Sequence, residues 1–267
     1  MEDYLSIRDF SRFSGVPSTT LRYWDEIGLF PPAKRDPETN YRYYAPEQII
    51  TINFVVVLSE LETPFKTIDS IRDERHPEAI IKLINQQEKV LNMEMRRLRE
   101  RYSIIHARRE LIDHGMHVED VDKISVEYRD DKAFIIGPPN TFPENGKFYE
   151  PFLNFCDQAE ELRINLKYPI SGYHDSMENF LAAPGQPDYF VSLDPTGNRT
   201  RVPGEYLVGY HRGYYGQFGD LPQRMTDYAK KHSLTFKGPV YAIYLHDEVC
   251  ITDPSQYLVQ VCVAVSK

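Results

Sequence analysis

Apolar residues near the start of the chain recur at helical spacing and predict two short helices. The first begins after Ser6, a residue type that caps helix N-termini, and Gly15 ends it. Its expected inward residues are Ile7, Phe10 and Phe13. The second has Ser18 as its expected N-cap and stops at Gly28, with the inward residues Leu21, Trp24 and Ile27. Two short helices joined by a sharp turn form a helix-turn-helix.

Polar and basic residues follow the outward side of this motif. The second helix carries on or near its outward face Thr19, Thr20, Arg22 and Tyr23. Behind it, basic residues flank the turn signal of residues 36–40, which suits a two-stranded wing. The wing candidates are Lys34, Arg35, Tyr41, Arg42 and Tyr43. In a winged helix-turn-helix the helix contacts base edges and the wing contacts phosphate, so these residues are candidate DNA contacts.

Two further helices are expected to complete this first domain. One starts at residues 45–47 and runs to Leu61, and it is so apolar that we expect it to lie under the wing as core. The other is expected to have Thr63 as its cap and Pro64 at its first position, and to end near His76. The predicted DNA-binding domain therefore spans residues 1–76.

A long helix follows, because no proline or glycine interrupts the chain from Pro77 to about His114. Five apolar residues fall seven apart: Ile84, Leu91, Leu98, Ile105 and Ile112. A sustained seven-residue repeat predicts a coiled coil, here on the order of 55 Å long. The alternative, a solvated single helix, would expose the whole row. We therefore expect residues 77–115 to form a dimerisation helix, and a homodimer suits a palindromic DNA site.

Beyond a linker at residues 116–120, the order strand, helix, strand, strand occurs twice within residues 121–267. The first copy comprises strand material at 124–136, a helix at 148–166, and strands at 168–175 and 189–193. The second comprises a strand at 205–211, a helix at 215–231, and strands at 240–247 and 257–265. Duplicated α+β halves usually enclose a cleft at their shared boundary.

Tyrosine is abundant in this second half and suits a ligand cleft. Its rings offer flat apolar walls and a π face that attracts cations. The candidates are Tyr173, Tyr206, Tyr210, Tyr214, Tyr241 and Tyr244. For any single tyrosine, a half-buried core position with its hydroxyl in water is the alternative. On the last strand, a row of valines is expected to pack on a helix, and Gln260 is the only strongly polar residue of the other side. Gln260 either contacts a ligand or satisfies neighbouring backbone groups.

Composition narrows the function classes. A net charge of −9 over 267 residues argues against indiscriminate coating of nucleic acid but leaves room for a local DNA-binding surface. No apolar run approaches a membrane span and no signal peptide precedes Tyr4, so we expect a cytoplasmic protein. The three scattered cysteines are expected to be free thiols. Three histidines near the end of the long helix have no cysteine beside them, and we expect no metal site and no cofactor. The sequence neighbours His174 and Asp175 form a weak candidate acid–base pair, because adjacent residues of a strand rarely point together, and we expect no catalytic residue.

Two stretches resemble known families. GVPSTTLRYWDEIGLFPPAKRDPETNYRYY resembles the winged helix-turn-helix of MerR-family transcription regulators, with an LRYY-type helix, a GL turn and an R-D-x-x-x-YRxY wing. Asn40 stands where that family usually has glycine, and asparagine tolerates a left-handed backbone. PGEYLVGYHRGYYGQF, GPVYAIYLHD and YLVQVCVAV resemble the GyrI-like effector-binding domain of BmrR-type multidrug sensors.

The resemblance implies an α and α+β fold: a winged helix-turn-helix head, a long dimerisation helix in an antiparallel coiled coil, and a duplicated βαββ GyrI-like domain. It implies a regulator that binds double-stranded promoter DNA as a homodimer, with RNA polymerase at the same promoter. Such a regulator activates by distorting the promoter spacer when a small hydrophobic or aromatic molecule occupies the C-terminal domain. The alternative is a GyrI-like hydrolase or drug-sequestering protein.

The resemblance also bears on ligand charge and on metals. In GyrI-like multidrug sensors the position of Gln260 is typically a glutamate, whose charge attracts lipophilic cations. We therefore expect this chain to bind neutral aromatic ligands at least as well as cations, unless Glu205 or Glu248 supplies the charge. MerR-family metal sensors use cysteines flanking the dimer helix, and this chain has none there.

Overall fold

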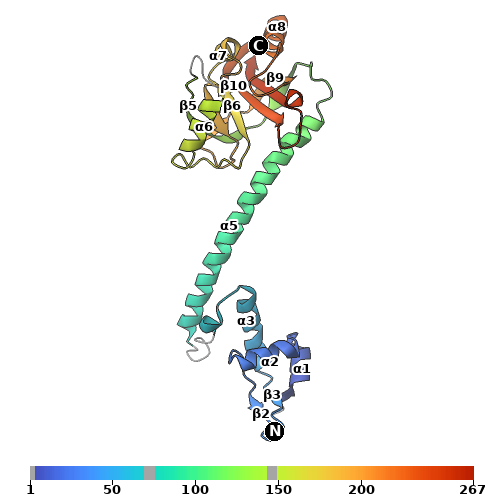
Figure 1. The fold of residues 1–267 in the computed structure, drawn as a ribbon, viewed down its shortest axis with the longest axis vertical. Coiled ribbons are helices and arrows are strands. Elements are labelled where there is room, and N and C mark those ends of the chain that lie inside the picture. Colours follow the sequence, from blue (N-terminus) through green and yellow to red (C-terminus); the bar gives the residue numbers. More distant parts are fainter. Residues whose placement is uncertain (1–3, 69–75, 143–148) are drawn as a thin grey trace. The chain divides into compact units, whose positions relative to one another are not determined.

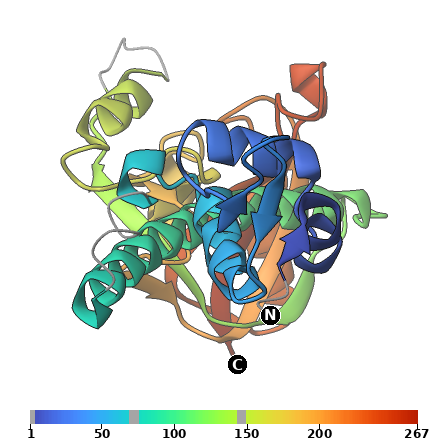
Figure 2. The ribbon, with the colours of Figure 1, turned by 90° about the horizontal axis from the view of Figure 1, so that it is seen from below.

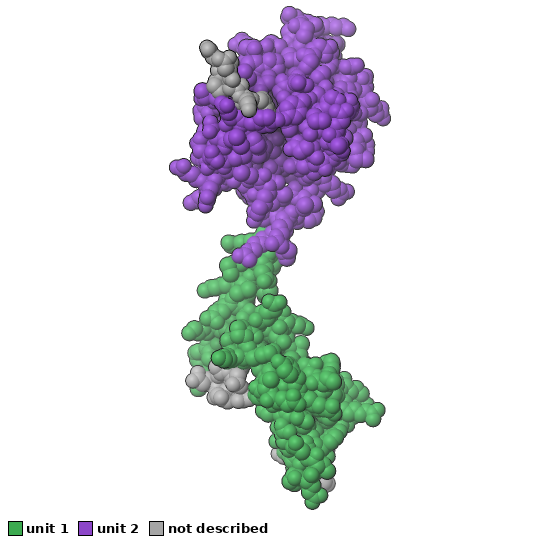
Figure 3. Space-filling view, viewed as in Figure 1, with its two compact units in different colours: residues 1–96 green, residues 97–267 purple. Residues whose placement is uncertain are grey.

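The chain folds into two compact units, residues 1–96 and 97–267 (Figure 3). The structure is a computed structural model and is described here for residues 4–68, 76–142 and 149–267. Helix α5 (Pro77–Met116) is continuous across the boundary between the units (Figure 1). Among the described helices, none has both the length and the apolar character needed to cross a membrane.

The first unit contains the predicted helix-turn-helix and wing (Figures 1 and 2). Its described helices include α1 (Ile7–Ser14), α2 (Ser18–Glu26) and α3 (Gln48–Glu60). Its antiparallel sheet has the order β1 (Leu5–Ser6), β3 (Arg42–Tyr44), β2 (Lys34–Arg35). The wing strands β2 and β3 agree with the prediction. Strand β1 was not predicted, because two residues are too few to show an alternating pattern.

Helix ends in this unit follow local chemistry. The Ser6 Oγ accepts from the backbone N–H of Asp9 at 3.1 Å, which confirms the predicted cap of α1. Gly15 ends α1 with a φ of 73°, and Asn40 in the wing turn has a φ of 56°. The predicted cap of α2 was wrong. Ser18 is already the first helical residue, and Pro17 before it caps without a side-chain hydrogen bond.

An aromatic stack forms the centre of this unit's core. The rings of Phe10 and Tyr44 are stacked with centroids 4.5 Å apart, and Phe30 lies 6.0 Å from Phe10. Two predicted inward residues are instead exposed, Phe13 by 55% and Ile27 by 44%. Phe13 lies beneath the guanidinium of Arg12, 4.6 Å from its ring centroid. Ile27 is the C-cap of α2 and so lies past its regular helical face.

Helix α3 buries one face rather than its whole surface. Ile52, Val55 and Leu58 are buried, whereas Ile50 is 79% exposed, so the prediction that the entire apolar segment is core was wrong. The predicted fourth helix is helical at residues 65–68, and residues 69–75 lie outside the described part. The buried Thr63 hydroxyl has no hydrogen-bond partner among the described residues, so the predicted side-chain cap is not formed.

Helix α5 begins at Pro77 as predicted but continues to Met116. Gly115 was expected to end it and instead lies in its last turn. A Cβ at Gly115 would come within 2.5 Å of the His246 ring, so the glycine permits close packing against strand β10 (Thr235–His246). Within the single chain, Leu98 is 60% exposed and Ile105 69% exposed.

The second unit is built on an eight-stranded antiparallel sheet of order β4-β9-β11-β10-β6-β7-β5-β8. The strands are β4 (Ser125–Arg129), β5 (Lys132–Pro139), β6 (Ile170–His174), β7 (Tyr189–Ser192), β8 (Arg199–Arg201), β9 (Gly204–Arg212), β10 (Thr235–His246) and β11 (Leu258–Ser266). The two predicted copies are β5-β7-β6 and β9-β11-β10, and both place the last strand between the other two. The two copies meet where β6 pairs with β10, and Gly172 of β6 is paired there with Ala242 of β10.

Helices of this unit are shorter than predicted. They are α6 (Tyr149–Gln158), α7 (Met177–Ala182), α8 (Leu221–Lys231) and the 3-10 turn η1 (Pro254–Gln256). The helix expected at 148–166 ends at Gln158, and residue 148 lies outside the described part. The helix expected from Tyr215 starts at Leu221, because Gly216 and Gly219 adopt positive φ angles of 78° and 51°. Helix α7 and strand β8 were not predicted, being too short to show a period.

The two faces of the sheet have different coverings. The valines of β11 pack with Leu221 and Met225 of α8, which confirms the predicted helix-facing row. The opposite face carries Tyr241 and Cys262 and packs against Leu111 of α5. The end of α5 therefore lies against the sheet face that carries Gln260.

Candidate functional site

Helix α2 exposes most of the residues that were predicted to contact DNA. Thr19 and Arg22 are exposed, Tyr23 is 50% exposed, and Thr20 is half-buried. Within the described part of the chain, the Arg22 side chain forms no hydrogen bond and no ion pair. Its five N–H donors are therefore available to an external acceptor such as a base edge.

The buried carboxylate of Asp25, on α2, binds two arginines of the wing. Arg35 donates to both carboxylate oxygens at 2.7 and 2.6 Å, and Arg42 donates through Nε at 2.5 Å. The Asp25 side chain is only 2% exposed. Sequence reasoning missed this role, because Asp25 looked like one more acidic residue in a mixed surface. Arg35 and Arg42 remain predicted phosphate contacts, but they also hold the wing against α2.

The other wing candidates lie towards solvent. The Lys34 ammonium is exposed and lies 5.9 Å from the ring centroid of Tyr4. Tyr41 is 42% exposed and packs on Tyr43, with centroids 5.3 Å apart. These groups suit contacts with a phosphate backbone, which needs a positive charge and hydrogen-bond donors.

The predicted ligand residues of the second unit divide between the two sheet faces. Tyr241 and Ile243 alternate with Ala242 and Tyr244 along β10, so they point to opposite sides. The side that faces α5 holds most of the candidates: Tyr173, Tyr206, Tyr210, Tyr241 and Gln260. Tyr244 lies on the other side, and Tyr214 flanks it through ring contacts with Tyr215 and Tyr257.

Gln260 is buried and belongs to a hydrogen-bonded group at the end of α5. Its Nε2 donates to the Tyr210 hydroxyl at 3.0 Å and to Nε2 of His114 at 2.9 Å. The Tyr210 hydroxyl and His114 Nε2 are 3.0 Å apart. Burial lowers the pKa of His114, with the Arg129 charge as the next cause, and so favours the neutral ring, whose Nε2 can accept from the Gln260 amide. Gln260 therefore satisfies side chains that sequence reasoning had no means of placing beside it.

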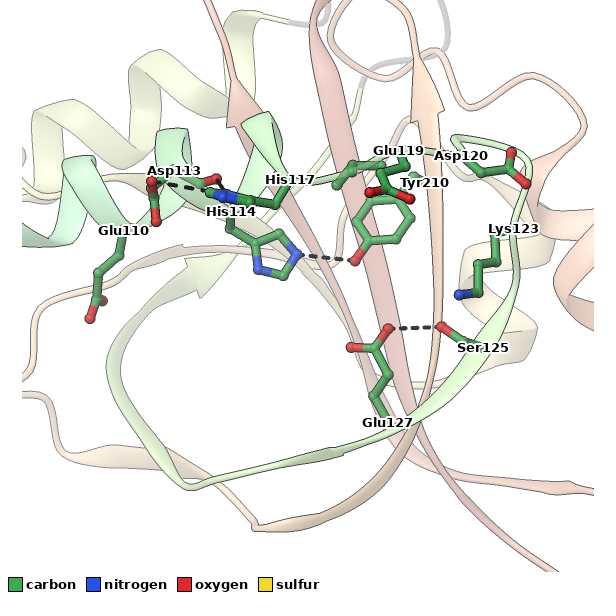
Figure 4. Close-up of a pocket in the computed structure, with 11 residues that line it drawn as sticks. Glu110, Asp113, His114, His117, Glu119, Asp120, Lys123, Ser125, Glu127 and Tyr210 are labelled. Carbon is green, nitrogen blue, oxygen red and sulfur yellow. Dashed lines mark hydrogen bonds and ion pairs between the residues drawn. The ribbon is translucent and has the colours of Figure 1, made fainter.

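A surface cavity of about 770 Å³ adjoins this group (Figure 4). Most of its lining is ionisable: Glu110, Asp113, His114, His117, Glu119, Asp120, Lys123 and Glu127. Figure 4 shows His114 bonded to Tyr210 and Ser125 bonded to Glu127 within it. Charged walls of this kind stay hydrated and offer few contacts to an apolar molecule. The cavity is therefore a poor candidate for the binding of a hydrophobic ligand.

A second cavity, of about 250 Å³, lies where the two copies meet, on the other face of the sheet. Its lining includes Gly172 and Ala242, the residues paired between β6 and β10. Its aromatic residues are Tyr149, Phe152, Tyr168, Phe190, Tyr215, Phe218 and Tyr244. A Cβ on Gly172 would lie 3.2 Å from the Pro187 ring, so glycine keeps this region open. An aromatic cavity with a few polar groups is typical of a small-molecule site.

Ionisable groups gather on one part of this aromatic cavity. The Tyr215 hydroxyl donates to the exposed carboxylate of Glu248, and burial together with this bond raises the pKa of Tyr215. Tyr215 therefore stays protonated and serves as a donor at neutral pH. Asp247 accepts from Arg108 of α5 at 2.6 Å. The Tyr244 hydroxyl donates to the Tyr214 carbonyl at 3.2 Å. A carboxylate beside tyrosine rings attracts an organic cation.

Sequence reasoning found Tyr244 but missed most of this lining. Glu248 was considered only as a possible source of charge, and His174 only as a weak acid–base partner of Asp175. Arg108 had no visible signal, since it lies in a helix far from the strands it joins. The alternation of side chains along β10 could have separated the residues of the two faces, because residues whose numbers differ by an odd number point to opposite sides of the sheet.

The head, the long helix and the sheet domain with its aromatic cavity together define a ligand-responsive, DNA-binding transcription regulator. Residues 5–74 match the family model described as "MerR HTH family regulatory protein". The DNA-binding head within residues 5–74 is therefore of the MerR type.

Two relatives from Bacillus subtilis (strain 168) align along nearly the whole chain. The multidrug-efflux transporter 2 regulator is 22% identical, over 94% of this chain and 92% of the relative. The multidrug-efflux transporter 1 regulator is 23% identical, over 100% and 99%. A solved structure described as an EcmrR–DNA complex is 15% identical, covers 98% of this chain and 100% of its own, and has a TM-score of 0.38.

Proposed function

We propose that this protein binds promoter DNA as a homodimer and activates transcription when a small hydrophobic or aromatic molecule fills the aromatic cavity. One observation carries the proposal: Arg108 of α5 both lines that cavity and pairs with Asp247 at its edge. Residues 77–96 of the same helix belong to the unit that carries the DNA-binding head. Because its target is promoter DNA, we place the protein in the cytoplasm.

The mechanism follows from this shared helix. A ligand that binds one arrangement of the Asp247–Glu248 segment better than another shifts the population of the Arg108 contact, and thus of α5. In a dimer, a small change in the two long helices alters how the two α2 helices meet successive major grooves. The change distorts the promoter spacer so that RNA polymerase engages both of its promoter elements.

Exposed apolar surfaces support the homodimer. The seam residues Leu91, Leu98 and Ile105 are 38%, 60% and 69% exposed in the single chain. Within the first unit, an apolar groove of about 720 Å³ is lined by residues that include Ile50, Phe54 and Ile81. A second copy of the long helix has the chemistry to cover such surfaces.

The names of the two Bacillus relatives, both regulators of multidrug-efflux transporters, support the binding of more than one drug-like ligand. We propose that the ligand is bound without chemical conversion. Ligand binding alone can serve regulation, because the chain also carries a long helix and a DNA-binding head. Stable, stoichiometric binding of an unaltered ligand is expected from mass spectrometry of the recovered compound. Conversion of the compound would favour the hydrolase alternative.

In vitro transcription tests the proposed function directly. The template carries a duplex that the purified protein selects from a random library, placed within a promoter of unusually long spacer. We expect transcripts to rise when tetraphenylphosphonium is added with RNA polymerase and protein, and not when either protein is omitted. Transcription that ignores every hydrophobic compound bound by the protein would contradict the proposal.

Replacing Arg22 with alanine should weaken binding to the selected duplex by about tenfold or more, because a bidentate base contact contributes about 1–3 kcal/mol. Fluorescence anisotropy at fixed salt measures the change. Lys230→Ala, on α8 of the second unit, removes the same charge away from the head and serves as the matched control. Equal affinity of Arg22→Ala and wild type would remove Arg22 from the DNA-contacting set.

Replacing Glu248 with glutamine should weaken tetraphenylphosphonium binding several-fold, because the amide removes Coulomb attraction but keeps the shape of the site. Gln260→Glu is the informative comparison, since Gln260 lies on the opposite face of the sheet. If Glu248 provides the charge, Gln260→Glu leaves the cation affinity unchanged. Stronger cation binding by Gln260→Glu would instead place the ligand on the face that packs against α5.

A further inference from the structure

His174 is the buried polar residue of the aromatic cavity whose hydrogen bonding is not accounted for. It is 1% exposed, lines the cavity, and has its ring 5.1 Å from that of Phe180. Neither Nδ1 nor Nε2 has a hydrogen-bond partner within the described residues. The Pro184 carbonyl lies near enough to favour the protonated ring, but the contact does not meet hydrogen-bond geometry.

Several other polar groups around the cavity are already paired. The Ser171 hydroxyl donates to the Ala242 carbonyl at 2.8 Å, and Asp247 accepts from Arg108. The nearby carboxylate of Asp188 accepts from the Asp175 N–H at 2.8 Å and from the Asn179 amide at 2.9 Å. His174 therefore differs from its neighbours, and an unpaired buried polar group is costly to a folded protein.

A phenylalanine would suit this environment better if the position served packing alone. The ring contacts Phe180 edge to face, and Val240 lies opposite on β10. An imidazole retained among such neighbours points to a hydrogen bond made with something that enters the cavity. The neutral imidazole offers one donor and one acceptor.

We propose that His174 selects the ligand, and that the cavity takes an aromatic molecule whose ring bears a neutral hydroxyl or amide group bound by His174. This inference rests on the proposed function, which makes the aromatic cavity the ligand site. A hydroxyl or an amide can donate to one imidazole nitrogen or accept from the other, so either ring tautomer serves. A charged group is disfavoured at a position so fully removed from water. Burial also keeps the imidazole uncharged, since it lowers the pKa of His174 to about 4.

The ligand class then has two parts. Its aromatic body lies against rings such as Phe190 and Phe218, and its hydroxyl or amide meets His174. A positive group, where the ligand has one, is accommodated at Glu248. His174 thus discriminates by hydrogen bonding, independently of the charge preference that Glu248 controls.

A double comparison of probes and variants tests this assignment. The probes are 2-naphthol and 2-methylnaphthalene, which differ by a hydroxyl in place of a methyl group. Titration calorimetry gives the ratio of their affinities for wild type, His174→Phe and His174→Gln. We expect the ratio to shift about tenfold against 2-naphthol in His174→Phe, the loss of one buried hydrogen bond. His174→Gln keeps a donor and an acceptor and should retain the preference. His232→Phe, beyond the end of α8, is the matched control.

Each result decides the question. An unchanged ratio in His174→Phe, with both probes bound, overturns the role of His174 while leaving the cavity as the ligand site. Failure of wild type to bind either probe contradicts the proposed ligand site and this inference together. Thermal unfolding without ligand adds a separate readout, since His174→Phe should melt at the same temperature as wild type or higher. A clearly lower melting temperature would show that His174 is a structural residue and overturn the proposal.

Discussion

Replacing both Leu91 and Leu98 with glutamate is expected to produce monomers that no longer hold a specific DNA site. The two side chains lie seven residues apart on α5, are 38% and 60% exposed in the single chain, and belong to the predicted seam. In a coiled-coil dimer the substitution would bury carboxylates in an apolar interface, which costs several kcal/mol for each unpaired charge. Loss of the dimer separates the two α2 helices that together span a palindrome.

Analytical ultracentrifugation measures the expected change in mass, and anisotropy with the selected duplex measures the loss of binding. Val90 and Met93 provide a matched control, because they are 41% and 53% exposed on α5 but lie off the seam. Glutamates at these two positions should leave the dimer intact. A tight dimer of the Leu91 and Leu98 variant would mean that the partner surface lies elsewhere on the chain.

Local chemistry made the first unit largely predictable from sequence. Ser6, Gly15 and Asn40 each impose a backbone feature through their own side chain or its absence, and all three features occur in the structure. The wrong predictions of inward residues arose where the helical spacing of apolar residues was extended to the end of a helix. Phe13 and Ile27 fit the apolar spacing, but each lies where the helix has no further neighbour to pack against.

The order of strands and helices in the duplicated sheet domain was predictable from the sequence, but the residues that line its cavity were not. The alternation of side chains along β11 correctly predicted that its row of valines packs against a helix, which is α8. The partners of Gln260 come from β9 and from His114, which lies 146 residues earlier in α5. No local pattern signals a contact of that separation. The abundance of tyrosine indicated a cleft, but burial on both faces of the sheet divided those tyrosines between core and cavity.

His174 shows how a correct observation led to too narrow a hypothesis. The pair His174–Asp175 was considered for acid–base chemistry and set aside, because neighbours in a strand rarely point together. The structure agrees on the geometry, with His174 buried and Asp175 exposed. What the sequence could not show is that the buried member lines an aromatic cavity without a hydrogen-bond partner.

Acid is expected to destabilise the protein through His174. Burial lowers the pKa of His174 from 6.5 to about 4, against the opposing effects of the Asp188 charge and the Pro184 carbonyl. As pH falls below about 6.5, the unfolded chain binds a proton at this residue while the folded chain does not. The free energy of unfolding therefore decreases between about pH 6.5 and pH 4 and then levels off, with a contribution on the order of 3 kcal/mol. Urea unfolding followed by circular dichroism at pH 7.5 and pH 4.5 measures it, and His174→Phe should lose correspondingly less stability over that interval. An equal loss in both proteins would assign the acid sensitivity to other groups and would mean that the buried imidazole is not held neutral.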